Sequence, residues 1–260
     1  MSKKSITKLH EYITQNSPTE KQLTDYVKEL AYLNEPTDRT ISVRYSQFKK
    51  HVRENHPQYS DEFLRNLNPP TELTKKIITE NKQRKLQRKM VEFDDNLIQK
   101  ILDLKESENP YENAIYLQLV SGRRINEVFD SPIRVNNRQP REVAMQLSKK
   151  TGKEKAKYHK FNLLKDTIDN KDFKQRLQKL RSSVNGVSLQ DFTNRVNRKV
   201  KSLIDKNLSS HDLRGLYAVY GFETDNPDDL NMLGYINSVL NHGDTSIDSS
   251  QSYSNFKYIK

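Results

Sequence analysis

The chain has 260 residues, with 45 Lys and Arg against 34 Asp and Glu, and its formal net charge is +11. The excess of basic residues is large and is spread along the chain rather than confined to one tail, so the expected partner is a polyanion. The absence of cysteine excludes disulfides, thiolate zinc sites and cysteine nucleophiles. No stretch approaches the ~18 apolar residues of a membrane span, and the start lacks the apolar core of a signal peptide. We therefore expect a soluble intracellular protein.

Residues 5–67 repeat their apolar positions at helical spacing and predict a bundle of four helices without strands. Ser17 is predicted to cap a helix over about 18–34. A third helix should stop before His56-Pro57, and Ser60 should cap a short fourth one. With no acid–base cluster in it, this bundle is predicted to be a binding module.

A strongly basic segment follows the break at Asn68-Pro69-Pro70. It could be the solvated surface of a helix, but in a basic protein we favour a linker that contacts DNA phosphates. Its basic residues are Lys75, Lys76, Lys82, Arg84, Lys85, Arg88 and Lys89. The predicted division of the chain is 1–68, a basic interdomain linker at 69–92, and 93–260.

Helical spacing resumes after Phe93, but one segment changes its period. Val143, Met145 and Leu147 alternate with polar residues, and after a turn at Lys149–Lys153 the segment 158–163 can pair back as a β-hairpin. Further helices are predicted around Phe173, Phe192 and 228–241, and the stretch 243–254 is polar. The predicted fold class is mainly α with a small β-hairpin (α+β).

Two clusters of basic residues could hold a phosphate. His211 and Arg214 are expected near the start of one helix, capped by Ser209-Ser210, where the helix dipole favours an anion. Arg124 is predicted to be anchored by the apolar helix around it and so to act as a clamp. The alternatives are ordinary surface ion pairs for His211 and Arg214, and an ion pair of Arg124 with Glu127.

Two further residues are weaker candidates on their own. His242 ends an apolar helix, where an imidazole can serve simply as a C-terminal cap. Lys150 lies in the predicted hairpin turn, where a lysine is usually a solvated edge residue. Each gains meaning only from the other motifs of the chain.

Five motifs in order resemble the tyrosine recombinase (phage integrase) family, most strongly over 93–260. They are Gly122-Arg123-Arg124-Ile125-Asn126-Glu127, Ser148-Lys149-Lys150-Thr151-Gly152, His211-Asp212-Leu213-Arg214, Leu240-Asn241-His242 and Ser249-Ser250-Gln251-Ser252-Tyr253. The resemblance implies an N-terminal helical core-DNA-binding domain at 1–68 and a tyrosine-recombinase-like catalytic domain at 93–260.

The resemblance also implies a mechanism, metal-free transesterification without a cofactor. The Tyr253 hydroxyl would attack a DNA phosphate to form a 3'-phosphotyrosyl link and free a 5'-hydroxyl. Since an ordinary phenol has a pKa of about 10, the tyrosine must lose its proton during attack. The implied roles are base for His211, phosphate ligands for Arg124, Arg214 and His242, acid for Lys150, and orienting group for Glu127.

The sequence leaves three residue assignments open: the nucleophile, the catalytic lysine and the first arginine. Tyr258 is a second candidate for the nucleophile. Lys149 and Lys153 compete with Lys150, and Arg123 competes with Arg124.

The predicted function is that of a site-specific recombinase or integrase from a virus, phage or other mobile element. It would act on double-stranded DNA as a dimer or tetramer, without a membrane, in a prokaryotic cytoplasm or in the nucleus or virus factory of a eukaryotic host. Exchange between duplexes would need several protomers docked through their C-terminal segments. Alternatives are a type IB topoisomerase-like enzyme and a catalytically inactive DNA-binding protein of the same fold.

Overall fold

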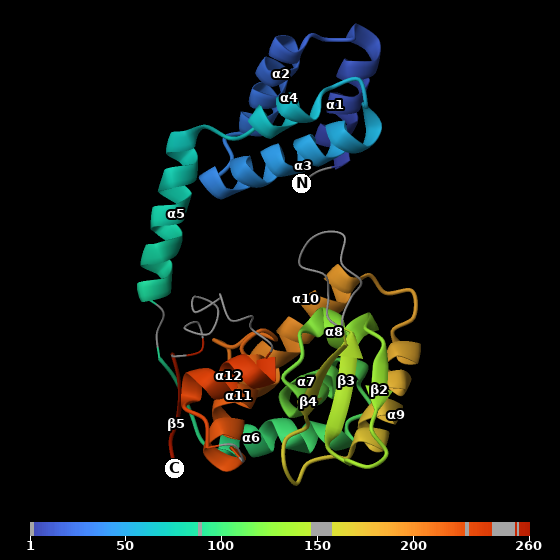
Figure 1. Ribbon diagram of the computed structural model, residues 1–260, viewed down its shortest axis with the longest axis vertical. Helices are drawn as coiled ribbons and strands as arrows, with labels where there is room; N and C mark the ends of the chain where they lie inside the picture. Colours follow the sequence, from blue (N-terminus) through green and yellow to red (C-terminus); the bar gives the residue numbers. More distant parts are fainter. Residues whose placement is uncertain (1–2, 88–89, 147–157, 227–228, 241–252, 254) are drawn as a thin grey trace. The chain divides into compact units, whose positions relative to one another are not determined.

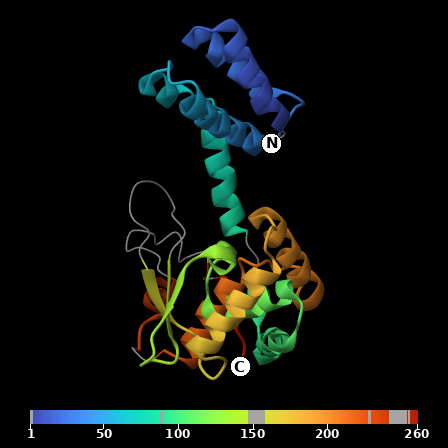
Figure 2. The ribbon, with the colours of Figure 1, turned by 90° about the vertical axis from the view of Figure 1, so that its right-hand side faces the viewer.

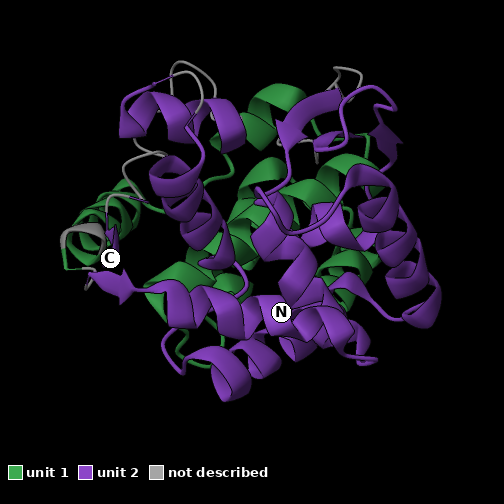
Figure 3. Ribbon diagram, turned by 90° about the horizontal axis from the view of Figure 1, so that it is seen from below, with its two compact units in different colours: residues 1–88 green, residues 89–260 purple. Residues whose placement is uncertain are grey.

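The computed structural model describes residues 3–87, 90–146, 158–226, 229–240, 253 and 255–260. The chain divides into two compact units, residues 1–88 and 89–260 (Figure 3). Four of the predicted site residues, Arg88, Lys89, Lys150 and His242, lie outside the described residues, as do Lys149, Lys153 and the side chain of Lys85. Every described helix is too short or too polar to cross a bilayer.

The first unit contains the predicted four-helix bundle. Its helices are α1 (Lys3–Asn16), α2 (Glu20–Tyr32), α3 (Asp38–Asn55) and α4 (Asp61–Asn66). Their apolar faces meet in one core that includes Leu9, Ile13, Leu23, Val27, Phe48 and Val52. Ser60 caps α4 as predicted, by accepting a hydrogen bond from the Phe63 amide.

The predicted cap of the second helix is wrong by two residues. The N-cap of α2 is Thr19, which forms a reciprocal capping box with Gln22. Ser17 has a φ of +43°, and its amide donates to the Ile13 carbonyl at the end of α1. A left-handed residue that closes one helix cannot adopt the extended backbone that an N-cap requires.

Most of the segment predicted as a linker is a helix. Residues 69–92 contain α5 (Thr71–Leu86) and strand β1 (Val91–Phe93). Helix α5 belongs to the first unit, where it contacts α3 and packs Leu73 against the bundle core. The basic residues of α5 therefore project from a continuous helix.

The second unit is built around a helix that is buried on all sides. Its helices are α6 (Asp95–Leu102), the 3₁₀ turn η1 (Asp103–Glu106), α7 (Pro110–Ser121), α8 (Ile125–Asp130), α9 (Asn170–Ser183), α10 (Leu189–Lys199), the π turn η2 (Val200–Ile204), α11 (Leu213–Thr224) and α12 (Met232–Leu240). Every residue of α7 from Ala114 to Ser121 is buried, because α6, α8, α9, α10 and α11 all pack around it (Figure 1).

A three-stranded antiparallel sheet lies beside these helices. It consists of β2 (Ile133–Val135), β3 (Glu142–Gln146) and β4 (Tyr158–Asn162), in that order (Figure 2). Strands β3 and β4 form the predicted hairpin, with Val143 opposite Phe161 in the core. The short strand β2 was not predicted, because three residues are too few to establish an alternating pattern.

The polar C-terminal stretch is followed by a strand that was not predicted. Strand β5 (Phe256–Tyr258) pairs in parallel with β1, and Val91 lies opposite Phe256. The Val91 amide donates to the Asn255 carbonyl, and the Ile259 amide donates to the Phe93 carbonyl. This pairing anchors the residues that directly follow Tyr253 to the beginning of the second unit.

Candidate active site

A tight turn at Gly122 separates two adjacent arginines into different environments. Gly122 ends α7 with a φ of +63°, a conformation that favours glycine, and a β-carbon at this position would overlap the Tyr217 ring. Arg123 after it is fully buried, whereas the side chain of Arg124 at the start of α8 is 25% exposed. The turn therefore directs only Arg124 toward the surface of the unit.

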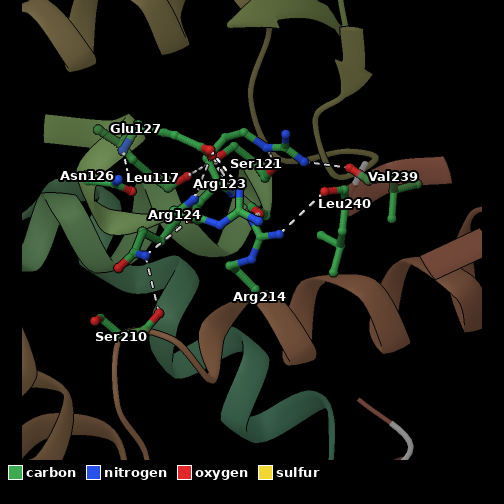
Figure 4. A network of polar contacts seen from close by, with 12 residues as sticks. Leu117, Ser121, Arg123, Arg124, Asn126, Glu127, Ser210, Arg214, Val239 and Leu240 are labelled. Atoms are coloured by element: carbon green, nitrogen blue, oxygen red, sulfur yellow. Dashed lines mark hydrogen bonds and ion pairs between the residues drawn. The ribbon is translucent and has the colours of Figure 1, made fainter. Parts of the chain in front are cut away.

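Glu127 is the hub of a buried polar network at this turn (Figure 4). Its carboxylate accepts from the Arg124 guanidinium at 2.9 Å and from the Arg124 amide at 3.0 Å, and lies 4.0 Å from the Arg214 guanidinium. Burial raises the pKa of Glu127, but the nearby Arg123 and the other cationic and hydrogen-bonding partners outweigh it and lower the pKa below its usual value. Glu127 is therefore a carboxylate at neutral pH and orients two arginines.

Arg214 connects this network to the end of α12. Its guanidinium donates to the Gly122 carbonyl at 2.6 Å and to the Leu240 carbonyl at 3.5 Å, and its side chain is 1% exposed. Arg214 lies in the first turn of α11, which begins at Leu213. These contacts hold the guanidinium rigidly, as a preorganised anion site requires.

His211 does not share a helix with Arg214, which corrects the prediction. The residues before α11 form a turn that is closed by hydrogen bonds from the Ser209 amide and hydroxyl to the Asp212 carboxylate. The Asp212 amide donates to the Ser209 carbonyl and the Arg214 amide to the His211 carbonyl, which is the spacing of a tight turn, and α11 starts two residues after His211. The imidazole is exposed, and its ring centroid lies 6.4 Å from that of Tyr253.

Tyr253 lies against Arg214. The Arg214 Nε donates to the Tyr253 hydroxyl oxygen at 3.4 Å, and the tyrosine is 3% exposed. The other candidate nucleophile, Tyr258, points elsewhere, because its hydroxyl donates to the Asp95 carboxylate at 2.7 Å. The structure thus brings Arg124, Glu127, Arg214, His211 and Tyr253 together in one place.

Arg123 is enclosed by other residues and has no access to solvent. It donates to the Ser121 and Val239 carbonyls, and its guanidinium lies 4.3 Å from the centre of the Phe161 ring. Burial lowers its pKa to about 10, so it stays charged at neutral pH. Three guanidiniums, those of Arg123, Arg124 and Arg214, thus surround the Glu127 carboxylate, and the excess positive charge suits a phosphodiester anion.

Two further residues of the site were missed by sequence reasoning. Gln118 is fully buried in α7 and donates to the Arg123 and Ser210 carbonyls, which ties together the segments that carry the arginines. His159 on β4 donates to the Val239 carbonyl, and burial, with Arg123 as the next cause, lowers its pKa to about 4. Strand alternation with Phe161 and Leu163 was a signal that could have placed His159 on the inner face.

The predicted DNA-contacting residues that the structure describes lie in the first unit. Lys75, Lys76, Lys82 and Arg84 are exposed on α5. Lys76 forms an ion pair with Asp38 at 2.7 Å.

The chain is similar to a described family and to several solved structures. Residues 87–256 match the family described as the telomere resolvase ResT/TelK catalytic domain. No curated protein matches the chain. A structure of protelomerase TelA covalently complexed with substrate DNA is 17% identical, with a TM-score of 0.76, and the match covers 99% of this chain and 89% of that one.

Two other structures show the same fold. A TelA mutant complexed with DNA hairpin product is 14% identical with a TM-score of 0.76, and the match covers 99% of this chain and 89% of that one. A lambda integrase dimer bound to a core site is 15% identical with a TM-score of 0.50, and the match covers 100% of this chain and 75% of that one. The family match supports the tyrosine-recombinase interpretation over the topoisomerase-like and inactive alternatives. The chain belongs to the telomere resolvase ResT/TelK catalytic domain family, relatives of the tyrosine recombinases that cut and rejoin DNA.

Proposed function

We propose that the protein is a telomere resolvase, which cuts double-stranded DNA through Tyr253 and rejoins each strand to its complement as a closed hairpin. The observation that carries this proposal is the contact between Tyr253 and Arg214 beside the Glu127 network, within a chain of the telomere resolvase family. The hairpin product bound to the TelA mutant supports the choice of reaction.

In the first step the Tyr253 oxygen forms a bond to phosphorus while the bond to the 5'-oxygen breaks. The phenol proton passes to His211, whose ring lies 6.4 Å from the tyrosine ring. Arg214 stabilises the developing phenolate, and both Arg214 and Arg124 hold the non-bridging oxygens, on which negative charge accumulates. Lys150 protonates the leaving oxygen, and His242 donates to the phosphate.

In the second step a 5'-hydroxyl of the opposite strand attacks the phosphotyrosine and releases Tyr253. The energy of the phosphodiester is conserved, so no nucleotide cofactor takes part. Two strands must be cut and two hairpins closed, so two protomers would act on a site with two-fold symmetry. The exposed basic face of α5 would contact the DNA phosphates, and the first unit would hold the duplex.

A recombinase that exchanges strands between duplexes is the second candidate. That reaction would require C-terminal segments docked between protomers. Here the segment after Tyr253 pairs with β1 of its own chain instead.

The nucleophile is tested by trapping the covalent adduct on a nicked duplex. We expect wild-type protein and Tyr258→Phe to form the adduct and Tyr253→Phe to form none, with the attached residue identified by mass spectrometry. An unchanged yield of adduct from Tyr253→Phe would exclude Tyr253.

The reaction is tested with one end-labelled duplex that carries an inverted repeat and a second duplex of different length. Hairpin closure yields, on a denaturing gel, a labelled strand twice as long as the arm from which it came. Products that join the two duplexes, without such strands, would instead establish strand exchange. Relaxation of a plasmid that lacks the repeat would establish topoisomerase activity.

A further inference from the structure

Three of the chain's six histidines meet in the first unit, far along the chain from the residues of the active site. His10 projects from α1, His51 from α3, and His56 caps the end of α3. One ring nitrogen from each lies within 4.8 Å of the other two. The ring centroids are 5.1 to 5.6 Å apart in all three pairs. A close trio of imidazoles needs a physical reason, because such rings repel one another when protonated.

The spacing of the nitrogens fits a tetrahedral metal ion. The His10 Nδ1 and the His56 Nε2 are 3.2 Å apart and form a hydrogen bond, which a bound ion would replace. Two ligands at the Zn–N distance of about 2.05 Å in a tetrahedral site lie about 3.3 Å from each other. His51 and His56 are separated by four residues, a spacing typical of zinc-binding histidine pairs. The pair is therefore already positioned as two corners of such a tetrahedron.

The third nitrogen points to the same conclusion. The His51 Nε2 is buried and has no hydrogen-bond partner in the part of the chain that the structure describes. A buried polar atom without a partner is unfavourable, and a bound ion would supply the missing partner.

The groups around the trio allow one open coordination position. His56 is 6% exposed, whereas His10 is exposed, so water can reach the ion from the His10 side. The side-chain amide of Asn55 lies 3.2 Å from the His51 Nδ1. After rotation of this amide its oxygen would accept the Nδ1 proton, as an outer-shell partner of a metal-bound histidine does.

We propose that His10, His51 and His56 bind one zinc ion, completed by water, which fastens α1 to the C-terminal end of α3. The site is independent of the DNA chemistry of the second unit. It explains the trio as ligands and adds a link between two bundle helices that are 41 residues apart at His10 and His51.

The experiment uses the full chain, stripped with a chelator, reconstituted with zinc chloride and desalted before elemental analysis. We expect one zinc per chain in the wild type. In His10→Gln and His51→Gln the zinc affinity should fall by more than the about 10- to 100-fold loss caused by removing an outer-shell partner. His211→Gln is the matched control, because it removes an exposed imidazole of the active site, and it should keep its zinc.

Two measurements make the outcome independent of folding defects. Substitution of cobalt(II) in the wild type should give the visible absorption of a tetrahedral site, and zinc should raise the melting temperature of the wild type and of His211→Gln but not of His51→Gln. A wild type that retains no zinc, or variants at His10 and His51 that bind zinc with wild-type affinity, would overturn the proposal.

Discussion

Two adjacent arginines differ in what they can do because a single turn gives them different surroundings. Arg123 is enclosed by the Ser121 and Val239 carbonyls and the Phe161 ring, whereas Arg124 is partly exposed and bound to Glu127. Arg214 is buried too, but its guanidinium contacts the Tyr253 hydroxyl, whereas that of Arg123 is occupied by the two carbonyls and the ring. The structure therefore favours Arg124 over Arg123 as the phosphate ligand.

Replacing each arginine by glutamine separates these roles. Arg124→Gln should lower the rate of adduct formation about 100- to 1000-fold, because one preorganised donor to the transition state is lost. Arg123→Gln should lower the free energy of unfolding by about 1–3 kcal/mol, since it takes from the buried Ser121 and Val239 carbonyls the donors that Arg123 provides. Single-turnover kinetics and urea denaturation measure the two effects. A larger loss of rate from a folded Arg123→Gln would reverse the assignment.

The neutral state of His159 gives the fold a dependence on pH. Its pKa is about 4 in the folded protein and about 6.5 in the unfolded chain. The unfolded chain therefore binds the proton first, and stability is lost as the pH falls from 6.5 toward 4, by up to about 1.4 kcal/mol per pH unit. The charged groups that act on its pKa are Arg123 and Arg214, which lower it, and Glu127, which raises it.

His159→Gln should make the free energy of unfolding less sensitive to acid. Glutamine can still donate to the Val239 carbonyl but cannot titrate. Urea denaturation at several pH values between 7.5 and 4.5 compares the slopes of the two proteins, and this comparison cancels the contribution of His51 and His56. Equal slopes would mean that His159 is protonated in the folded state as readily as in the unfolded one.

At the scale of elements, the position of the nucleophile depends on how β5 packs against α11. The Phe256 ring lies directly on the backbone of Gly215, which follows Arg214 in α11, and a β-carbon at Gly215 would overlap that ring. Phe256 is three residues after Tyr253 and is held by the pairing of β5 with β1. The bare glycine thus lets the strand approach the helix that carries Arg214.

Gly215→Ala should displace Phe256 and slow adduct formation although it removes no reacting group. Interiors are close-packed, so an added methyl group costs about 1–3 kcal/mol of stability and shifts the neighbouring strand. Gly234→Ala in α12 is the matched control, since a β-carbon there meets only Asn231 and Leu230 at 3.3 Å or more. Equal rates of adduct formation in the two variants would mean that the position of Tyr253 does not depend on the packing of β5.

At the scale of the whole molecule, positive charge is distributed over both units. The second unit concentrates arginines around Glu127, whereas the first unit presents the exposed lysines of α5. The two sets suit different tasks. A fixed guanidinium cluster can hold one phosphate in a defined orientation. Flexible exposed lysines contribute affinity that does not depend on the DNA sequence.

Lys75→Glu and Lys82→Glu should weaken DNA binding equally for target and unrelated duplexes. Each lost phosphate contact should also reduce the slope of log affinity against log salt by about 1. Lys50→Glu is the control, because it makes the same charge change on α3, where Lys50 is paired with Glu54. Fluorescence anisotropy at several salt concentrations measures the affinities. An unchanged affinity in the α5 variants would mean that α5 does not contact the DNA.

Local patterns in the sequence determined much of this protein. Helical spacing predicted the four-helix bundle, alternation predicted the β3–β4 hairpin, and Ser60 marked the start of α4. The order of the motifs indicated the family. These features are readable because periodicity and capping depend on residues within a few positions of one another.

Tertiary packing alone decided what meets at the site. The contacts of Arg214 with Gly122 and Tyr253, the inward position of His159, and the pairing of β1 with β5 join segments far apart in the chain. Even the neighbours Arg123 and Arg124 differ through partners on α12 and β4. A sequence pattern reports which face of an element is apolar, whereas the identity of the element that covers that face depends on how the whole chain packs.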